Sequence, residues 1–252
     1  MQRFKNAIVG VELDRRHDAA VVDYAEFVTR MAGSDRVHLA HVLPSPMSLG
    51  DLYPQYRQSF ETAREEARDR IDRIVDGRFG GPERSTVRTL LLEGTPLVEI
   101  LRLSTDEDAD LVIVGQDHDG GTTTEKLARK APCSVLIVPP DATPRIERVV
   151  VPVDFSEHAA DAVDVAVAFA EAAGLEEIHL LHVYPVPTGY MKLGRDRDEF
   201  ARQIHLHAES RFETFMTYTN TRGLRAERHV VEGEDVPATI LRTAAELGSD
   251  LL

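Results

Sequence analysis

Apolar residues follow two alternating patterns along the chain, one typical of buried strands and the other of amphipathic helices. Ala7–Val11 is a continuous, largely β-branched run bounded by charged residues, which predicts a strand buried on both faces. Apolar residues then recur at helical spacing from Ala20 to Met31 and stop at Gly33, which indicates a helix with a glycine at its C-terminal end. A long amphipathic helix is predicted over Phe60–Phe79. Its apolar stripe consists of Ala63, Ala67, Ile71, Ile74 and Val75.

The rest of this half of the chain continues the alternation of strand and helix. Further strands are predicted at Val37–Val42, Thr86–Leu92, Leu111–Val114 and Ser134–Val138, and a helix over Pro96–Ser104. Buried strands that alternate with helices predict an α/β fold, in which helices cover both faces of a parallel sheet. Ligands of such sheets bind at the carboxyl ends of the strands. The loops after the first, second and fourth strands are therefore the candidate binding loops.

The pattern repeats after about 140 residues. The segment "AGSDRVHLAHVLP" (32–44) matches "AGLEEIHLLHVYP" (173–185), and "LLLEGTPLVEILRLSTDEDADLV" matches "HVVEGEDVPATILRTAAELGSDLL". The chain is thus predicted to hold two copies of one domain, residues 1–140 and 146–252, joined by the polar segment "PPDATPR". The second copy stops at Leu252, where its fourth strand begins, so it is truncated in this sequence. Because a sheet cut there would expose an apolar edge, we expect the natural chain to continue.

Charge and composition narrow the classes of function. The 43 acidic residues outnumber the 29 basic ones, and the net charge of −14 argues against binding to nucleic acid through its phosphates. The sequence shows neither a secretory signal nor an apolar run of the roughly 20 residues that would cross a bilayer. Cys133 is the single cysteine and cannot form an internal disulfide. Together these features predict a cytoplasmic protein that does not associate with membranes.

Several blocks in this order resemble a known family. The run "RVVVPVDFSEHAADAVDVAVAFAEAAG" with "IHLLHV" is similar to the opening of a universal stress protein domain, and "ADLVIVG" with "EKLARKAPCSVLIVPP" resembles its closing segment. The resemblance covers essentially the whole chain as two tandem domains. It implies a flavodoxin-like or adenine-nucleotide α-hydrolase-like fold with parallel five-stranded sheets in the order 3-2-1-4-5.

The same resemblance implies partners. Members of the family typically dimerise through the last strand, and some bind ATP or AMP. We therefore expect the two domains to pack as an intramolecular pseudo-dimer, with Ser134–Val138 at or near the interface. A homodimer of the chain is a further expectation.

The resemblance also implies which residues meet the nucleotide. In ATP-binding members an Asp ends the first strand, and a Val after the second-strand "LLH" lines the adenine site. The second copy has Asp154 and Val183 at these positions, and the strand end that precedes the acid is Pro152–Val153. The first copy has Val42 but carries Glu12 in place of the Asp.

A glycine loop, G-x2-G-x9-G-[S/T], wraps the phosphates after the fourth strand in ATP-binding members. In the first copy this motif begins at Gly115, but His118 stands where the second glycine belongs. Only two residues separate His118 from Gly121 and Thr122, so the middle of the motif is lost. The corresponding loop of the second copy would lie beyond Leu252.

Two interpretations of this shortened loop remain. Its glycines and the helix that follows could present N–H groups to an anion. Alternatively, Thr122 caps that helix and Glu125 completes a capping box. Asp117 and Asp119 would repel a phosphate, so we interpret the loop as a degenerate nucleotide site that serves as a helix cap.

The placement of the histidines argues against a metal site, and the absence of known catalytic motifs argues against catalysis. His38 and His41, like His179 and His182, lie three apart on a predicted strand and face opposite sides of the sheet, so neither pair can share an ion. No metal site is predicted, and no nucleophile elbow, Walker motif or H-E-x-x-H is present.

The sequence therefore predicts a stress-response regulatory protein that is not an enzyme, or that hydrolyses ATP weakly at most. It is expected to bind ATP or AMP mainly through the second domain. One alternative is a scaffold that binds no nucleotide and acts through protein partners or oligomerisation. Another is a nucleotidyl-transfer or ligase-type enzyme of the same superfamily, for which the sequence shows no catalytic group.

Overall fold

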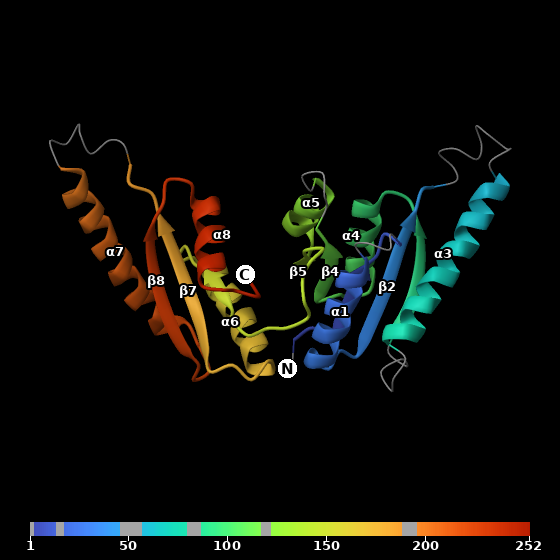
Figure 1. Ribbon diagram of the computed structural model, residues 1–252, viewed down its shortest axis with the longest axis horizontal. Coiled ribbons are helices and arrows are strands. Elements are labelled where there is room, and N and C mark those ends of the chain that lie inside the picture. Colours follow the sequence, from blue (N-terminus) through green and yellow to red (C-terminus); the bar gives the residue numbers. More distant parts are fainter. Residues whose placement is uncertain (1–2, 14–17, 46–56, 80–86, 117–121, 188–195) are drawn as a thin grey trace. The chain divides into compact units, whose positions relative to one another are not determined.

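A computed structural model describes residues 3–13, 18–45, 57–79, 87–116, 122–187 and 196–252. The chain divides into two compact units, Met1–Arg145 and Ile146–Leu252, in each of which strands alternate with helices (Figure 1).

The first unit has the α/β architecture that the hydrophobic pattern predicts. Its elements are β1 (Asn6–Gly10), α1 (Asp18–Ala32), β2 (Arg36–Leu43), α3 (Arg57–Arg78), β3 (Val87–Glu93), α4 (Pro96–Asp106), β4 (Leu111–Gly115), α5 (Thr122–Lys130) and β5 (Ser134–Val138). The five strands are parallel and lie in the order β3-β2-β1-β4-β5, which confirms the expected topology.

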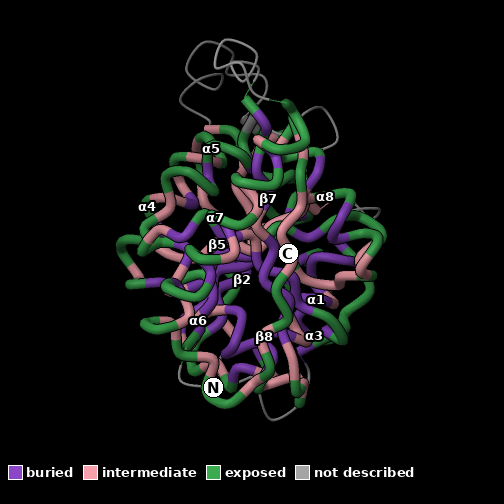
Figure 2. The backbone as a smooth tube through the Cα atoms, turned by 90° about the vertical axis from the view of Figure 1, so that its left-hand side faces the viewer, coloured by how far each residue is buried: buried purple, intermediate pink, exposed green. Residues whose placement is uncertain are grey.

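Helices cover both faces of this sheet. Helices α1 and α3 contact each other and the sheet, whereas α4 contacts β2 and α5 contacts β5. On the α4 and α5 side, Ile8 and Val112 pack against Ile100 and Leu127. Buried residues gather on the central strands β1, β2 and β4, whereas β3 and β5 at the edges are mostly half-buried or exposed (Figure 2). Ala63, which was predicted to belong to the apolar stripe of α3, is exposed. The buried stripe of this helix begins one turn later, at Ala67.

The second unit repeats this plan over the residues it contains. Its elements are β6 (Val150–Pro152), α6 (Glu157–Ala172), β7 (Glu177–Tyr184), α7 (Arg197–Tyr218), β8 (Arg225–Glu232) and α8 (Val236–Glu246). The parallel strands lie in the order β6-β7-β8. Leu251 forms a parallel bridge with Val149, just as Leu111 pairs with Ala7 in the first unit.

An aspartate before the fourth-strand position clamps the start of each repeat. Asp110 accepts hydrogen bonds from the backbone N–H groups of Lys5 (2.7 Å) and Asn6 (3.0 Å). Asp250 accepts them from Glu147 (3.0 Å) and Arg148 (3.1 Å). The repeated "D-L" of the sequence thus fixes the entry into the first strand of each unit, because it satisfies N–H groups that the sheet leaves open.

The described residues contain no helix that is both long enough and apolar enough to cross a membrane.

Cys133 is expected to react slowly in the folded protein. It packs beside the apolar cluster under α4 and α5, and burial, followed by the charge of Asp110, raises its pKa to about 11. Since the thiolate is the reactive species, the folded protein should react with iodoacetamide at pH 8 roughly a hundredfold more slowly than the urea-unfolded chain. Mass spectrometry of the alkylated protein measures both rates at this single thiol, and similar rates would contradict the burial.

Candidate functional site

The strand-end residues of the second unit form a turn at the carboxyl end of β6. Val153 stays beside β7, because its N–H donates to the carbonyl of Leu181 (2.8 Å) and its carbonyl accepts from Nδ1 of His182 (2.8 Å). After it, Asp154 leaves the sheet and is exposed. Pro152, Val153 and Asp154 therefore lie at the carboxyl ends of the strands, where parallel sheets bind ligands.

The carboxylate of Asp154 is held in one orientation. Its Oδ1 accepts the backbone N–H of Ser156 (2.9 Å), and Ser156 is the N-cap of α6, where its side chain accepts from Ala159 (3.1 Å). Hydrogen bonds from Ser156 lower the pKa of Asp154, and the charge of Arg211 adds to this effect. Asp154 therefore does not cap the helix itself, and it presents an anionic group to solvent at neutral pH.

Aromatic side chains support this turn from inside. Phe155 has a left-handed backbone (φ 66°) and is buried. Its ring packs against His182 (4.3 Å between centroids) and edge-on against Phe212 (4.9 Å). Arg211 lies over the same ring (4.6 Å) and donates to the carbonyl of Asp154 (3.2 Å). A non-glycine residue at positive φ is strained, so this packing is what keeps the turn in place.

Val183 lies near the carboxyl end of the neighbouring strand β7. It is buried and packs with Val150, Leu181 and Ala244 on the side of the sheet that α8 covers. Asp154 and Val183 thus come from the carboxyl ends of adjacent strands, where Asp154 is exposed and the side chain of Val183 is buried in the core.

The first unit carries a different acid at the equivalent strand end. Glu12 is exposed, its backbone N–H donates to Oδ1 of Asp18 (2.9 Å), and Leu13 has a left-handed backbone (φ 62°). Arg70 of α3 donates to the carbonyl of Leu13 (3.3 Å), as Arg211 does to that of Asp154. Val42 is half-buried and packs against the α4 and α5 core.

Part of the shortened glycine loop lies in the described structure. Gly115 ends β4, and a Cβ there would lie 3.1 Å from Cγ2 of Val21, so close packing of α1 favours glycine. Thr124 donates to the carbonyl of Gly115 (3.3 Å). Helix α5 begins at Thr122 itself. Gly121 and the preceding residues 117–120, with both aspartates and the histidine, lie outside the described residues, as does the Thr122 side chain, so the degenerate-loop interpretation stays a prediction.

The paired histidines of the second strands have two different environments. Nδ1 of His41 donates to the carbonyl of Val11 (2.8 Å), as His182 does to that of Val153, so both brace the extension of the first strand. His179 faces the other way and meets His229 of β8, with 3.0 Å between Nδ1 and Nε2. The spacing of histidines along one strand does not reveal this neighbour on the next strand.

Buried His38 is expected to weaken the first unit in acid. Burial lowers its pKa, with help from Arg36 and Arg88 and against the charge of Glu107 (Nε2 to Oε2, 3.5 Å). The unfolded chain, with a histidine pKa of about 6.5, then binds more protons than the folded one. The contribution of neutral His38 to the free energy of unfolding is therefore fully present above pH ~6.5, and it is lost as the pH falls towards the pKa of His38 in the folded state.

Urea unfolding at pH 7.5 and 5.5 tests this, with hydrogen exchange of the β1 and β2 peptides as the readout. His38→Leu should flatten the pH dependence of these peptides, whereas replacing the exposed His207 with Leu should leave it unchanged. Equal pH dependence in the protein and in His38→Leu would contradict the assignment.

Comparison with known proteins places both repeats in one family. The universal stress protein family model matches residues 3–139 and 145–252. A universal stress protein of Methanothermobacter thermautotrophicus is 33% identical over 76 residues, which are 27% of this chain and 52% of the relative. The chain thus spans about half the length of that curated relative.

Solved structures share the fold. A universal stress protein from Archaeoglobus fulgidus aligns with a TM-score of 0.65 and 18% identity, over 97% of this chain and 85% of its own. A protein of unknown function from Pseudomonas aeruginosa aligns with a TM-score of 0.63 and 19% identity, over 98% and 80% respectively.

Proposed function

Because the chain belongs to the universal stress protein family as a tandem of two domains, we propose that it is a stress-response regulator that binds an adenine nucleotide, ATP or AMP, mainly through its second domain. The observation that carries the proposal is Asp154. Its carboxylate is exposed, anionic and oriented at the carboxyl end of β6, and β6 pairs with β7, the strand that carries Val183.

The proposed roles follow from the chemistry of each group. A carboxylate accepts hydrogen bonds from the hydroxyl or amino groups of a nucleoside. Pro152, which is partly exposed, is proposed to supply apolar surface for the flat base, and buried Val183 is proposed to support that surface from the core. The N–H of Val153 is engaged by Leu181, so Val153 contributes by holding the turn beside β7.

The first domain is proposed to bind nucleotide more weakly. Glu12 places its carboxylate one methylene further from the backbone than Asp154 does. Val42 keeps its position, and Gly115, Gly121 and Thr122 keep only the ends of a phosphate loop. The helix start at Thr122 is consistent with a loop reduced to a helix connection.

We also propose that the two domains form a pseudo-dimer through β5. This strand lies at an edge of its sheet, and Ile137 on it is 38% exposed. An apolar edge strand offers unpaired backbone groups to a partner. We propose that the protein works in the cytoplasm and that it responds to whether nucleotide is bound, rather than by hydrolysing the nucleotide.

Isothermal titration of the full chain with ATP and with AMP tests the proposal. Saturable binding with a thermal shift is expected. Absence of heat and of a thermal shift at millimolar nucleotide would leave the scaffold as the function. ATP turnover that depends on a second substrate would instead indicate an enzyme.

A further inference from the structure

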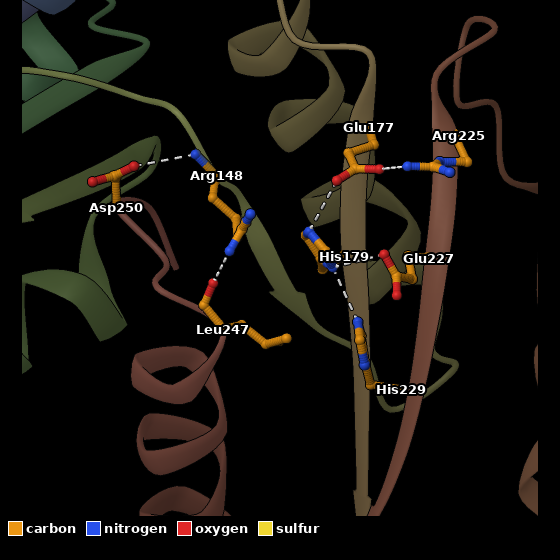
Figure 3. Close-up of polar contacts among 8 residues, drawn as sticks. All are labelled: Arg148, Glu177, His179, Arg225, Glu227, His229, Leu247 and Asp250. Atoms are coloured by element: carbon orange, nitrogen blue, oxygen red, sulfur yellow. Dashed lines mark hydrogen bonds and ion pairs between the residues drawn. The ribbon is translucent and has the colours of Figure 1, made fainter.

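Three side chains able to ligate a metal ion meet on the second domain's sheet (Figure 3). His179 comes from β7, and Glu227 and His229 come from β8. His179 pairs in register with Glu227, and His229 pairs with Leu181. Residues two apart on a strand share a face, so all three side chains lie on the face where Leu181 packs against Ala244 of α8.

The distances suit a common ligand. Nδ1 of His179 lies 3.0 Å from Nε2 of His229 and 3.5 Å from Oε2 of Glu227. Donor atoms about 2.1 Å from one ion lie roughly 3.0 to 3.4 Å apart at right or tetrahedral angles. All three ligand atoms lie within 4.8 Å of one another, and Glu227 is exposed, so a small rotation of its side chain completes the set.

His179 provides a second and independent observation. Its side chain is 5% exposed, and its Nε2 is buried without a hydrogen-bond partner among the described residues. That nitrogen lies 3.6 Å from Oε1 of Glu177, whose carboxylate is paired with Arg225. An ion on Nδ1 would fix the proton on Nε2 and direct it at Glu177. Metal-bound histidines typically donate their other N–H to a carboxylate in this way.

We propose that His179, Glu227 and His229 bind one divalent transition-metal ion, and that two imidazoles with one carboxylate suit Zn²⁺ best. Glu227 is exposed and His229 half-buried, which leaves a path for the ion and a fourth position for water. The ion would link β8, at the edge of the described sheet, to β7. The site does not depend on nucleotide binding, because Asp154 and Val183 lie towards the other end of the strands.

The first domain supplies an internal contrast. His38 occupies the position of His179, but its register partner is Arg88, where the second domain has Glu227. Leu90 stands where the second domain has His229. A cation and an apolar side chain cannot ligate zinc, so we expect a single site per chain.

Titration of the chelator-treated full chain with Zn²⁺, in competition with a chromophoric chelator, tests the proposal. One equivalent should bind at micromolar or lower concentration and raise the thermal midpoint of the protein. Co²⁺ in its place should give the visible absorption of a site with nitrogen and oxygen ligands. His229→Leu, the residue of the first domain, should weaken Zn²⁺ binding at least tenfold, whereas His207→Leu should not change it.

Glu227→Gln tests the same site at an exposed position where folding is not at risk. It should also weaken binding, by several-fold or more, with the circular dichroism spectrum unchanged. Absence of saturable Zn²⁺ binding, or equal affinity in the folded Glu227→Gln and His229→Leu variants and the parent protein, would overturn the proposal. Loss of nucleotide binding would not affect either result.

Discussion

Replacing Phe212 with alanine should destabilise the second domain by about 3–5 kcal/mol, the usual cost of removing a fully buried phenylalanine. Phe212 is completely buried and packs edge-on against Phe155 (4.9 Å) and near His182 (6.4 Å). The substitution leaves a cavity under the turn at Phe155. The backbone of Phe155 has a φ of 66°, and that packing holds it in this strained conformation. Urea unfolding, followed by hydrogen exchange of the β6 and β7 peptides, observes the second domain separately from the first.

Leu206→Ala on the same helix is the matched control. Its side chain is 62% exposed, so the change should stay within about 0.5 kcal/mol. Similar effects of the two substitutions would show that the aromatic cluster does not hold the domain together. A second consequence is specific to Phe212. Asp154 directly precedes Phe155 in this turn, so nucleotide affinity should fall together with stability in Phe212→Ala but not in Leu206→Ala.

The sequence predicted the fold because its signals are local and repeated. Short β-branched runs such as Ala7–Val11 are buried on both faces, and Gly33, with a φ of 60°, ends α1 as expected. The internal repeat then fixed the equivalence of the two units, down to the bridge between Val149 and Leu251. Boundaries shifted by a few residues, because helix and strand ends depend on which hydrogen bonds the neighbouring chain offers.

Of the site, the sequence predicted the residues that can be aligned one by one between the repeats, but not the contacts that distant elements make with them. Asp154 lies at the strand end where it was expected, but Arg211 and Phe212, which hold its turn, come from a helix more than fifty residues away. The approach of His179 to His229 depends on the register between β7 and β8. A one-residue slip would put His229 on the other face, so spacing along one strand could not reveal the pair.

The most direct test of how the two domains divide the function is the pair Asp154→Ala and Glu12→Ala. Both acids are exposed and each precedes a residue with a left-handed backbone, so the substitutions are matched in position and in charge. A hydrogen bond to a charged group contributes about 1.5–3 kcal/mol, so Asp154→Ala should weaken ATP or AMP binding roughly 10- to 150-fold. Glu12→Ala should change it less than about twofold, because the first domain is proposed to bind nucleotide more weakly.

Isothermal titration of both variants and the parent protein measures these affinities, and circular dichroism checks that each variant is folded. Asp154→Asn separates the carboxylate's charge from its role in the turn, because its side-chain oxygen can still accept the N–H of Ser156. If the nucleotide is recognised by the anion, Asp154→Asn should lose most of the affinity that Asp154→Ala loses. Equal effects of Asp154→Ala and Glu12→Ala would refute the assignment to the second domain, since two exposed acids on repeated turns would then act alike.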